Sequence, residues 1–161
     1  MLEEQVLDPA VHDREGFDCG VPALNEYLQR YAEQHRRKGI SAAYVLVDSA
    51  AVSIVLGYYT LSAAEVDVAQ LADAERRRLP RYPVPCFRMG RLACRIDRRG
   101  SGLGKLLVGC AVDRCLKARE QVAAYALIVD AKDETARLFY EHFGFRRLID
   151  RDLTLYLSLG R

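Results

Sequence analysis

No apolar run in the 161 residues approaches the roughly 18 residues that a membrane-spanning helix requires. The first residues, Met1-Leu2-Glu3-Glu4, are acidic, whereas the start of a secretory signal peptide is basic. These two absences exclude a membrane-embedded protein and give no sign of export. We therefore expect a soluble, cytoplasmic protein that does not act at a membrane.

Clustered metal ligands are also missing. The chain has five cysteines and three histidines, but it contains neither a C-x-x-C pair nor an H-x-x-x-H pair. The odd number of cysteines also argues against a framework of disulfides. We expect reduced cysteines that lie mostly in the core, and no metal site.

What the chain does have is enough apolar material for one core. Half of its residues are hydrophobic, and a chain of this length buries most of its surface around a single core. There is no internal repeat, linker or low-complexity tract. The sequence predicts a single domain over residues 1–161.

Positive charge is concentrated in one stretch. Residues 76–99 contain nine arginines and one acidic residue, Asp97, so this stretch carries +8 while the whole chain carries +2. Guanidinium groups pair bidentately with phosphate, so the stretch suits a polyanionic ligand. For Arg76–Arg78 the alternative is a solvated charged face. A second basic group, residues 35–38, closes the first predicted helix, where it would complement the helix dipole.

The most informative segment is Arg98–Lys105, which contains glycines at positions 100, 102 and 104. Glycines allow positive φ angles and close approach to the backbone, and the following residues have helical spacing, so free amides face the turn. This predicts a phosphate site. It is not a P-loop, because Leu106 follows Lys105, and it is not a dinucleotide fingerprint, because position 105 is lysine. An ordinary glycine-rich connection is the alternative.

The periodicities predict alternating helices and strands in a mixed α/β sheet with helices on both faces. In chain order we expect a helix from Pro22 to Gly39, strands over 42–47 and 52–62 that form a hairpin, a polar helix containing Val68, Leu71 and Ala72, a strand over 86–96, a helix over 105–119, a strand over 124–129, a helix from Asp133 to Gly144 and a half-buried strand over 152–159. The helix over 105–119 has an apolar face formed by Leu106, Leu107, Cys110, Ala111, Val112 and Cys115.

Three blocks of this sequence resemble the GNAT acyltransferases: Gly90–Cys94, the R-x-x-G-x-G pattern of Arg99–Gly104, and Ala136–Tyr140 together with Phe143-Gly144-Phe145. More narrowly, Phe17–Gly20, Leu24–Leu28 and Gly57–Leu61 are similar to blocks of the acetyltransferase toxins of bacterial type II toxin–antitoxin modules. The resemblance covers nearly the whole chain. It implies a single-domain GNAT fold, whose central mixed, mostly antiparallel sheet has one parallel pair at the acetyl-CoA cleft and helices on both faces.

The resemblance also implies an activity, namely acetyl-CoA-dependent transfer of acetyl to the α-amino group of aminoacyl-tRNA, which blocks translation, without a metal. The implied acetyl-CoA contacts are backbone of the central strand, the glycine turn and an aromatic side chain: Leu92, Ala93, Cys94, Arg99, Gly100, Ser101, Gly102, Leu103, Gly104, Lys105 and Phe139. Basic side chains are the expected tRNA contacts: Arg36, Arg37, Lys38, Arg77, Arg78 and Arg91.

Tyr140 is the candidate catalytic residue. An amine that attacks a thioester expels a thiolate, which needs a proton donor near the sulfur, and GNAT relatives place a tyrosine there. The alternative is an aromatic core position. No carboxylate lies between Cys86 and Ile96 to act as the general base, so either water accepts the proton or the amine has a low pKa; Glu26 is another candidate base.

Two other functions remain open from the sequence. One is a GNAT enzyme acting on a small amine, an antibiotic or a peptide amine, and the other is a GNAT-like protein that binds acyl-CoA or RNA without turnover. For a toxin, the resemblance further implies an antitoxin partner with a ribbon-helix-helix DNA-binding domain, and a homodimer.

Overall fold

The computed structural model describes residues 1–160 and divides into two compact units. The first unit comprises Met1–Ser62 and Gly90–Ala111, and the second comprises Ala63–Met89 and the residues from Val112 onward. Strand β3 (Gly57–Val66), strand β4 (Val84–Cys94) and helix α4 (Leu103–Ala118) each contribute residues to both units.

The first unit begins with a strand that the sequence did not predict. β1 (Leu2–Val6) pairs antiparallel with β2 (Ala42–Asp48), with Leu2 opposite Asp48. β2 in turn pairs antiparallel with β3, with Ala42 opposite Leu61. The predicted hairpin is therefore confirmed, with an added strand at the edge of the sheet.

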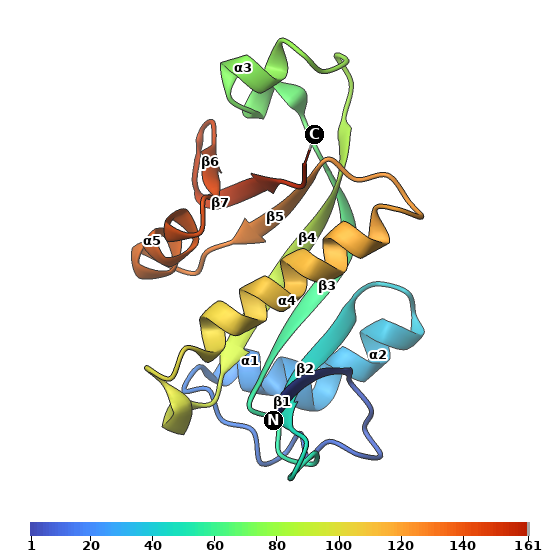
Figure 1. Cartoon of the computed structure of the whole chain (residues 1–161), viewed down its shortest axis with the longest axis vertical. Coiled ribbons are helices and arrows are strands. Elements are labelled where there is room, and N and C mark those ends of the chain that lie inside the picture. The colour runs from blue at the N-terminus through green and yellow to red at the C-terminus, as the bar shows by residue number, and fades with distance from the viewer. Residues whose placement is uncertain (161) are drawn as a thin grey trace. The chain divides into compact units, whose positions relative to one another are not determined.

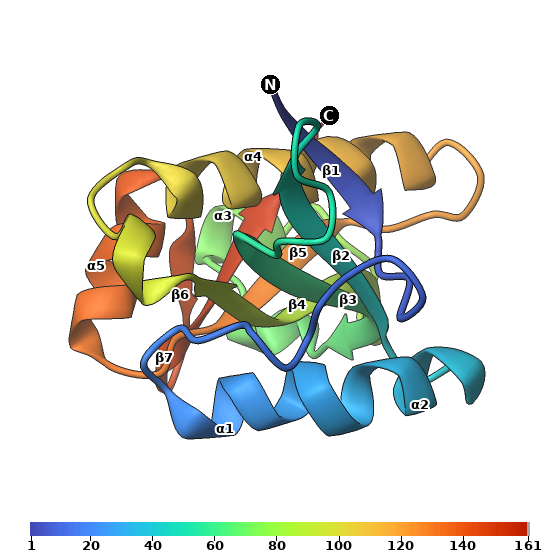
Figure 2. The same cartoon turned by 90° about the horizontal axis from the view of Figure 1, so that it is seen from below.

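A continuous helical stretch joins β1 to β2. It consists of α1 (Pro22–Glu26), the π-helical turn η1 (Tyr27–Tyr31) and α2 (Ala32–Arg37). Pro22 at its start and Gly39 just past its end, with φ of 72°, confirm the predicted boundaries. Figure 2 shows this stretch on one side of the strands and α4 on the other, so helices cover both faces of the sheet in this unit.

The second unit contains the parallel strand pair. β4 runs parallel to β5 (Ala126–Asp130), with Cys86 opposite Ala126, and β5 pairs antiparallel with β7 (Arg151–Ser158) (Figure 1). β6 (Arg146–Leu148), which was not predicted, pairs antiparallel with β7. The strand order of the seven-stranded sheet is β1-β2-β3-β4-β5-β7-β6. The predicted mixed sheet with a parallel pair is confirmed.

Each unit has its own group of buried side chains. In the first, Phe17, Leu28, Val45 and Tyr58 belong to a cluster that joins the helical stretch to the strands. In the second, Leu71, Ile128, Leu148 and Tyr156 belong to another. The five cysteines are free thiols, three of them buried and two half-buried.

Two predicted boundaries were wrong. β3 begins at Gly57 and not at residue 52, because Ala51 forms a bridge with Asp48 and Ile54 forms a bridge with Asp13. The polar helix expected around Val68 is a 3₁₀ turn, η2 (Val68–Gln70), followed after Leu71 by the short helix α3 (Asp73–Arg76). The break occurs where Leu71 adopts an extended backbone with ψ of 161°.

Two predicted buried faces also need correction. On α4, Leu106 is 40% exposed, whereas Leu103 and Val108 are buried, so the inward face is rotated from the one expected. On β7, Leu153 is exposed while both Leu155 and Tyr156 are buried. β7 is thus covered on both faces along part of its length, and its leucines do not define a single half-buried side.

Within residues 1–160 no helix combines the length and apolarity needed to span a membrane. The same residues contain no group of three or more histidine, cysteine, aspartate or glutamate side chains placed to hold a metal ion.

Candidate active site

The glycine turn connects β4 to α4 within the first unit. Gly100 and Gly102 have φ of 80° and 83°, and a Cβ at either position would have no atom within 4 Å. The turn thus requires glycine for its backbone conformation and is open above that backbone. Leu103, the first residue of α4, buries its side chain, so only its backbone N–H is available to a ligand. The first amides of α4 point out of a helix N-terminus, which favours an anion.

The segment Phe17–Gly20 anchors the start of this turn. The N–H of Ile96 donates to the carbonyl of Asp18 at 2.8 Å, and the guanidinium of Arg99 donates to the carbonyl of Cys19 at 2.9 Å. The Asp18 carboxylate accepts from the N–H of Gly20 and from the Asn25 amide, and these bonds lower its pKa. Arg99 therefore spends one N–H donor on the protein backbone and keeps the others for a ligand.

The end of β4 lies close to β3 and α4. A Cβ on Gly57 would lie 2.9 Å from the carbonyl oxygen of Ala93 and 2.8 Å from a methyl of Leu107. Ala93 is buried, and Leu92 and Cys94 are half-buried. Burial raises the pKa of the Cys94 thiol to about 11, so this thiol is neutral and unsuited to act as a nucleophile near pH 7.

Tyr140 lies on α5 (Glu134–His142) in the second unit. Asp133 caps this helix by accepting from the N–H of Ala136 at 2.8 Å. Tyr140 is 6% exposed, and its ring contacts Phe139 and Phe145 with centroid distances of 5.3 and 5.5 Å. An aromatic cluster therefore fixes the tyrosine on its helix.

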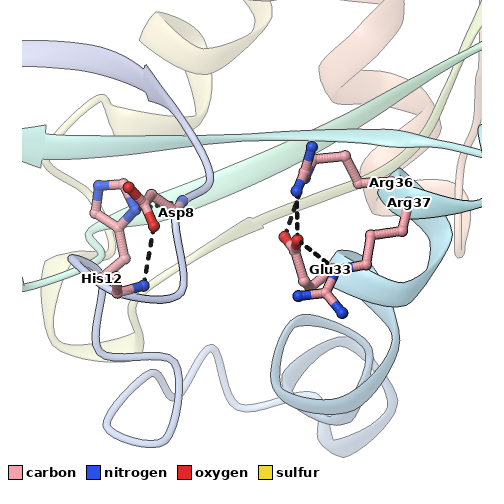
Figure 3. A network of polar contacts seen from close by, with 6 residues as sticks. Asp8, His12, Glu33, Arg36 and Arg37 are labelled. Atoms are coloured by element: carbon pink, nitrogen blue, oxygen red, sulfur yellow. Dashed lines mark hydrogen bonds and ion pairs between the residues drawn. The ribbon is translucent and has the colours of Figure 1, made fainter.

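The basic residues at the end of α2 are partly neutralised. Arg36 and Arg37 both donate to the Glu33 carboxylate, Arg36 through two nitrogens at 2.5 and 3.0 Å (Figure 3). The bonds from Arg36 are the main reason that the pKa of Glu33 is lowered. Lys38 is exposed, as are Arg77 and Arg78 in the second unit. Of the predicted tRNA contacts, Arg36 and Arg37 thus already have an acidic partner.

Arg91 stands in a group of rings that sequence reasoning missed. Its guanidinium carbon lies 3.5 Å from the centroid of the Tyr27 ring, and the Tyr27 hydroxyl is 2.9 Å from Nδ1 of His35. The ring of Tyr31 lies 6.4 Å from that of Tyr27 and 6.2 Å from that of His35. The spacing of 27, 31 and 35, four residues apart on a predicted helix, was the available signal.

The first unit thus brings together the glycine turn, Leu92–Cys94, Arg91 and the basic end of α2. The second unit holds Tyr140, Phe139, Arg77 and Arg78.

Of the candidate bases, Glu26 is exposed at the end of α1. The buried Glu75, which sequence reasoning did not single out, accepts from the Ser158 hydroxyl at 2.9 Å.

A family model described as an acetyltransferase (GNAT) domain matches residues 43–147. The chain belongs to the GNAT acetyltransferase family. Among curated proteins, this GNAT chain is 34% identical over 133 residues to the tRNA-acetylating toxin of Mycobacterium tuberculosis, which covers 83% of this chain and 78% of the relative.

Solved structures of toxins share the fold. KacT, solved as a variant with one tyrosine replaced by phenylalanine, superimposes with a TM-score of 0.92, 31% identity and coverage of 98% of this chain and 95% of KacT. AtaT complexed with acetyl-methionyl-tRNAfMet superimposes with a TM-score of 0.91 and 31% identity, and the match covers 98% of this chain and 95% of AtaT. A tyrosine-to-phenylalanine variant of AtaT has been solved bound to acetyl-CoA and the C-terminus of the antitoxin AtaR. It superimposes with a TM-score of 0.83 and 30% identity, and the match covers 98% of this chain and 93% of AtaT. The predicted GNAT membership and fold are confirmed.

Proposed function

We propose that this GNAT protein is a toxin that transfers acetyl from acetyl-CoA to the α-amino group of aminoacyl-tRNA and so blocks translation. The observation that carries the proposal is the likeness, over 98% of the chain, to AtaT complexed with acetyl-methionyl-tRNAfMet. The 34% identity to a tRNA-acetylating toxin supports the same substrate. Acyl transfer from a thioester to an amine needs no metal, so acetyl-CoA is the one cosubstrate proposed.

Acetyl-CoA supplies an activated acetyl thioester, and the open glycine turn fits its pyrophosphate. The backbone amides of Gly100–Gly104 would donate to phosphate oxygens, and the remaining N–H groups of Arg99 and the ammonium of Lys105 would balance the charge. The backbone of Leu92–Cys94 would hydrogen-bond the pantetheine arm in the manner of an added strand. Phe139 would supply apolar contact.

We assign the proton donor to Tyr140. When the tetrahedral intermediate collapses, the C–S bond breaks, and the tyrosine hydroxyl would donate its proton to the leaving sulfur. KacT and AtaT have both been solved as variants with one tyrosine replaced by phenylalanine, and the same exchange at Tyr140 tests the assignment in this chain.

We propose that water accepts the proton of the attacking amine, because the amine of this substrate is weakly basic. An α-amino group whose carboxyl is esterified to tRNA is less basic than the ammonium of lysine, so it would lose its proton to water. This fits a β4 strand without a carboxylate. Glu26 is the alternative base, and its exposed position at the end of α1 leaves it accessible to a substrate.

For binding of the tRNA we propose the basic residues Arg36, Arg37, Lys38, Arg77, Arg78 and Arg91. Because charged tRNA serves ribosomes, the enzyme would act in the cytoplasm. AtaT has been solved with the C-terminus of AtaR. By analogy we propose an antitoxin for this chain, with a ribbon-helix-helix domain, and a homodimeric toxin.

The direct experiment measures transfer of radiolabelled acetyl from acetyl-CoA to a pool of charged tRNA. The same pool after deacylation, a polyamine and a peptide amine are run beside it. Label confined to charged tRNA is the expected result. Label in the small amines would contradict the toxin proposal and indicate an enzyme that acetylates small amines. No transfer to any acceptor would favour a protein that binds acyl-CoA or RNA without turnover.

Tyr140→Phe tests the proton donor. Loss of the hydroxyl should lower kcat for acetyl transfer by about 100-fold or more, the usual scale for a general acid. The affinity for acetyl-CoA, measured by calorimetry, should stay within about twofold because the ring is retained. Tyr82→Phe, which removes the hydroxyl of a tyrosine that is 66% exposed and outside the proposed site, is the control. Unchanged kcat in Tyr140→Phe would remove the assignment.

A further inference from the structure

Three rings and one guanidinium form a compact group in the first unit, which we name the aromatic–arginine cluster: Tyr27, Tyr31, His35 and Arg91. Tyr27 is at its centre and is buried, while Tyr31 is 42% exposed. His35 is half-buried and lies 5.3 Å from Tyr27, ring to ring. The cluster therefore has a fixed inner ring and an accessible outer ring.

A π-helical turn builds this arrangement. In η1 the N–H of Ala32 donates to the carbonyl of Tyr27, five residues earlier, so the turn is wider than an α-helical one. π-turns are rare and occur frequently at functional sites. Tyr27 and Tyr31 are the first and last residues of η1, and the hydroxyl of Tyr27 meets His35 on α2.

The guanidinium of Arg91 has no acidic partner. It lies over the Tyr27 ring, and none of residues 1–160 forms an ion pair or a side-chain hydrogen bond with it. Three other arginines of the 76–99 stretch, by contrast, pair with aspartates: Arg76 with Asp73, Arg88 with Asp130 and Arg95 with Asp97. A half-buried cation that keeps its hydrogen-bond donors is suited to a phosphate or to the polar edge of a base.

We propose that the aromatic–arginine cluster binds the single-stranded 3′ end of the tRNA, with a nucleobase stacked on Tyr31 and Arg91 bound to a phosphate or base edge. Exposed rings beside an unpaired arginine are how proteins hold unpaired nucleotides. The exposed Lys38 and Arg30 add positive charge along the same helical stretch. This inference rests on the proposed function, since it specifies how the acceptor is held.

The position of Arg91 on β4 agrees with this assignment. A strand rises about 3.3 Å per residue, so the Cα of Arg91 lies within about 10 Å of the Cα atoms of Leu92–Cys94. Those residues are the proposed contacts of the pantetheine arm, whose end carries the acetyl group. The 3′-terminal nucleotide carries the aminoacyl ester. A base held at the cluster would therefore bring the amine toward the acetyl-CoA backbone contacts.

The test uses an RNA minihelix that has an acceptor-stem duplex and a single-stranded CCA overhang, with 2-aminopurine in place of the terminal adenine. Stacking quenches 2-aminopurine fluorescence, so titration with the protein reports both affinity and stacking. Tyr31→Ala should weaken binding by about 5- to 150-fold, the range for one stacked base, and abolish the quenching. Tyr31→Phe, which keeps the ring, should behave as the wild type.

Tyr82→Ala is the matched control, because Tyr82 is a more exposed tyrosine, at 66%, outside the cluster. It should bind and quench as the wild type does. Acetyl-CoA affinity and circular dichroism of Tyr31→Ala establish that this variant is folded. A blunt minihelix without the overhang should bind the wild type and Tyr31→Ala equally.

Equal quenching by the wild type and Tyr31→Ala would overturn the inference while acetyl transfer to charged tRNA still upheld the proposed function. If the wild type neither binds the overhang nor transfers acetyl to charged tRNA, both fail. If the wild type transfers acetyl to charged tRNA without quenching the probe, only the inference fails.

Discussion

His12 is a buried side chain whose neutral form fits its surroundings. It is 3% exposed, the N–H of Asp8 donates to its Nδ1 at 3.0 Å, and its Nε2 lies 2.8 Å from the Gln5 side-chain oxygen. Nδ1 thus accepts while Nε2–H donates. Burial lowers the pKa of this imidazole below its ordinary value of 6.5, and the nearby Asp8 opposes that shift only in part (Figure 3).

The sign of the pH effect follows from this lowered pKa. At pH values just below 6.5 the unfolded chain binds a proton at His12 that the folded chain does not, so stability falls as the pH falls through this window. We expect the urea midpoint of the wild type to fall more steeply between about pH 7.5 and pH 5 than that of His12→Asn, which keeps an acceptor near Asp8 but does not titrate.

The carboxyl groups of Asp18, Glu33 and Asp48 ordinarily titrate below pH 5, and the fold lowers their pKa values further. They therefore lose their charges at more acidic pH and do not affect this window. Parallel curves for the wild type and His12→Asn would contradict the role assigned to His12.

Among the elements, the glycine turn allows a direct test of where the pyrophosphate of acetyl-CoA binds. A glutamate at position 102 would place a carboxylate over the amides proposed to bind pyrophosphate and would force a side chain into positive φ. Gly102→Glu should weaken acetyl-CoA binding by at least about tenfold in calorimetry, since one tenth of the affinity corresponds to only about 1.4 kcal/mol.

Gly39→Glu is the matched control for this change. Gly39 also has positive φ, at 72°, and also has open space around a built Cβ, so the backbone strain and the added charge are the same. Both variants should lose comparable stability, but only Gly102→Glu should lose acetyl-CoA affinity. Equal acetyl-CoA affinities would refute the placement of the pyrophosphate.

Elements with strong local signals were the ones that the sequence predicted well. Pro22 and Gly39 bound the first helical stretch, and Asp133 and Gly144 bound α5, because capping is local chemistry. β1 was missed because three of its five residues are polar and it forms by pairing with β2, a partner about 40 residues away. β6 has three residues, too few for any periodicity.

The candidate site divides along the same line. The glycine turn, Leu92–Cys94 and Tyr140 were predicted as site residues from short motifs and the family resemblance that these motifs carry. The anchoring of Arg99 on Cys19 and the contact of Arg91 with Tyr27 were not, because each joins residues more than 60 positions apart. The π-turn was equally out of reach, since helical periodicity assumes 3.6 residues per turn.

At the scale of the whole molecule, fewer positive side chains are free to bind phosphate than the sequence suggested. Arg36 and Arg37 share Glu33, while Lys38, Arg77, Arg78 and Arg91 have no acidic partner among residues 1–160. If each of those four neutralises one phosphate, the logarithm of tRNA affinity should fall with the logarithm of salt concentration with a slope of about −3 to −4. Fluorescence anisotropy over a KCl series measures this slope.

Replacing Arg77 and Arg78 together by alanine should reduce the magnitude of that slope by about 1.5. Arg76→Ala is the control from the same run of arginines, because Arg76 is already paired with Asp73 at 2.5 Å, and it should leave the slope nearly unchanged. A double variant with the slope of the wild type would show that this run does not contact the tRNA.

The π-turn has a consequence for how this chain is compared with others. A π-turn is what remains when a helix accommodates one extra residue without shifting the residues on either side of it. A homologue whose helix is regular here would align with a one-residue gap within Tyr27–Tyr31, and closing that gap would rotate everything up to Arg37 by about 100°. The presence or absence of that single residue thus decides whether a relative keeps His35 facing Tyr27, and aligned sequences alone are enough to tell the two kinds of relative apart.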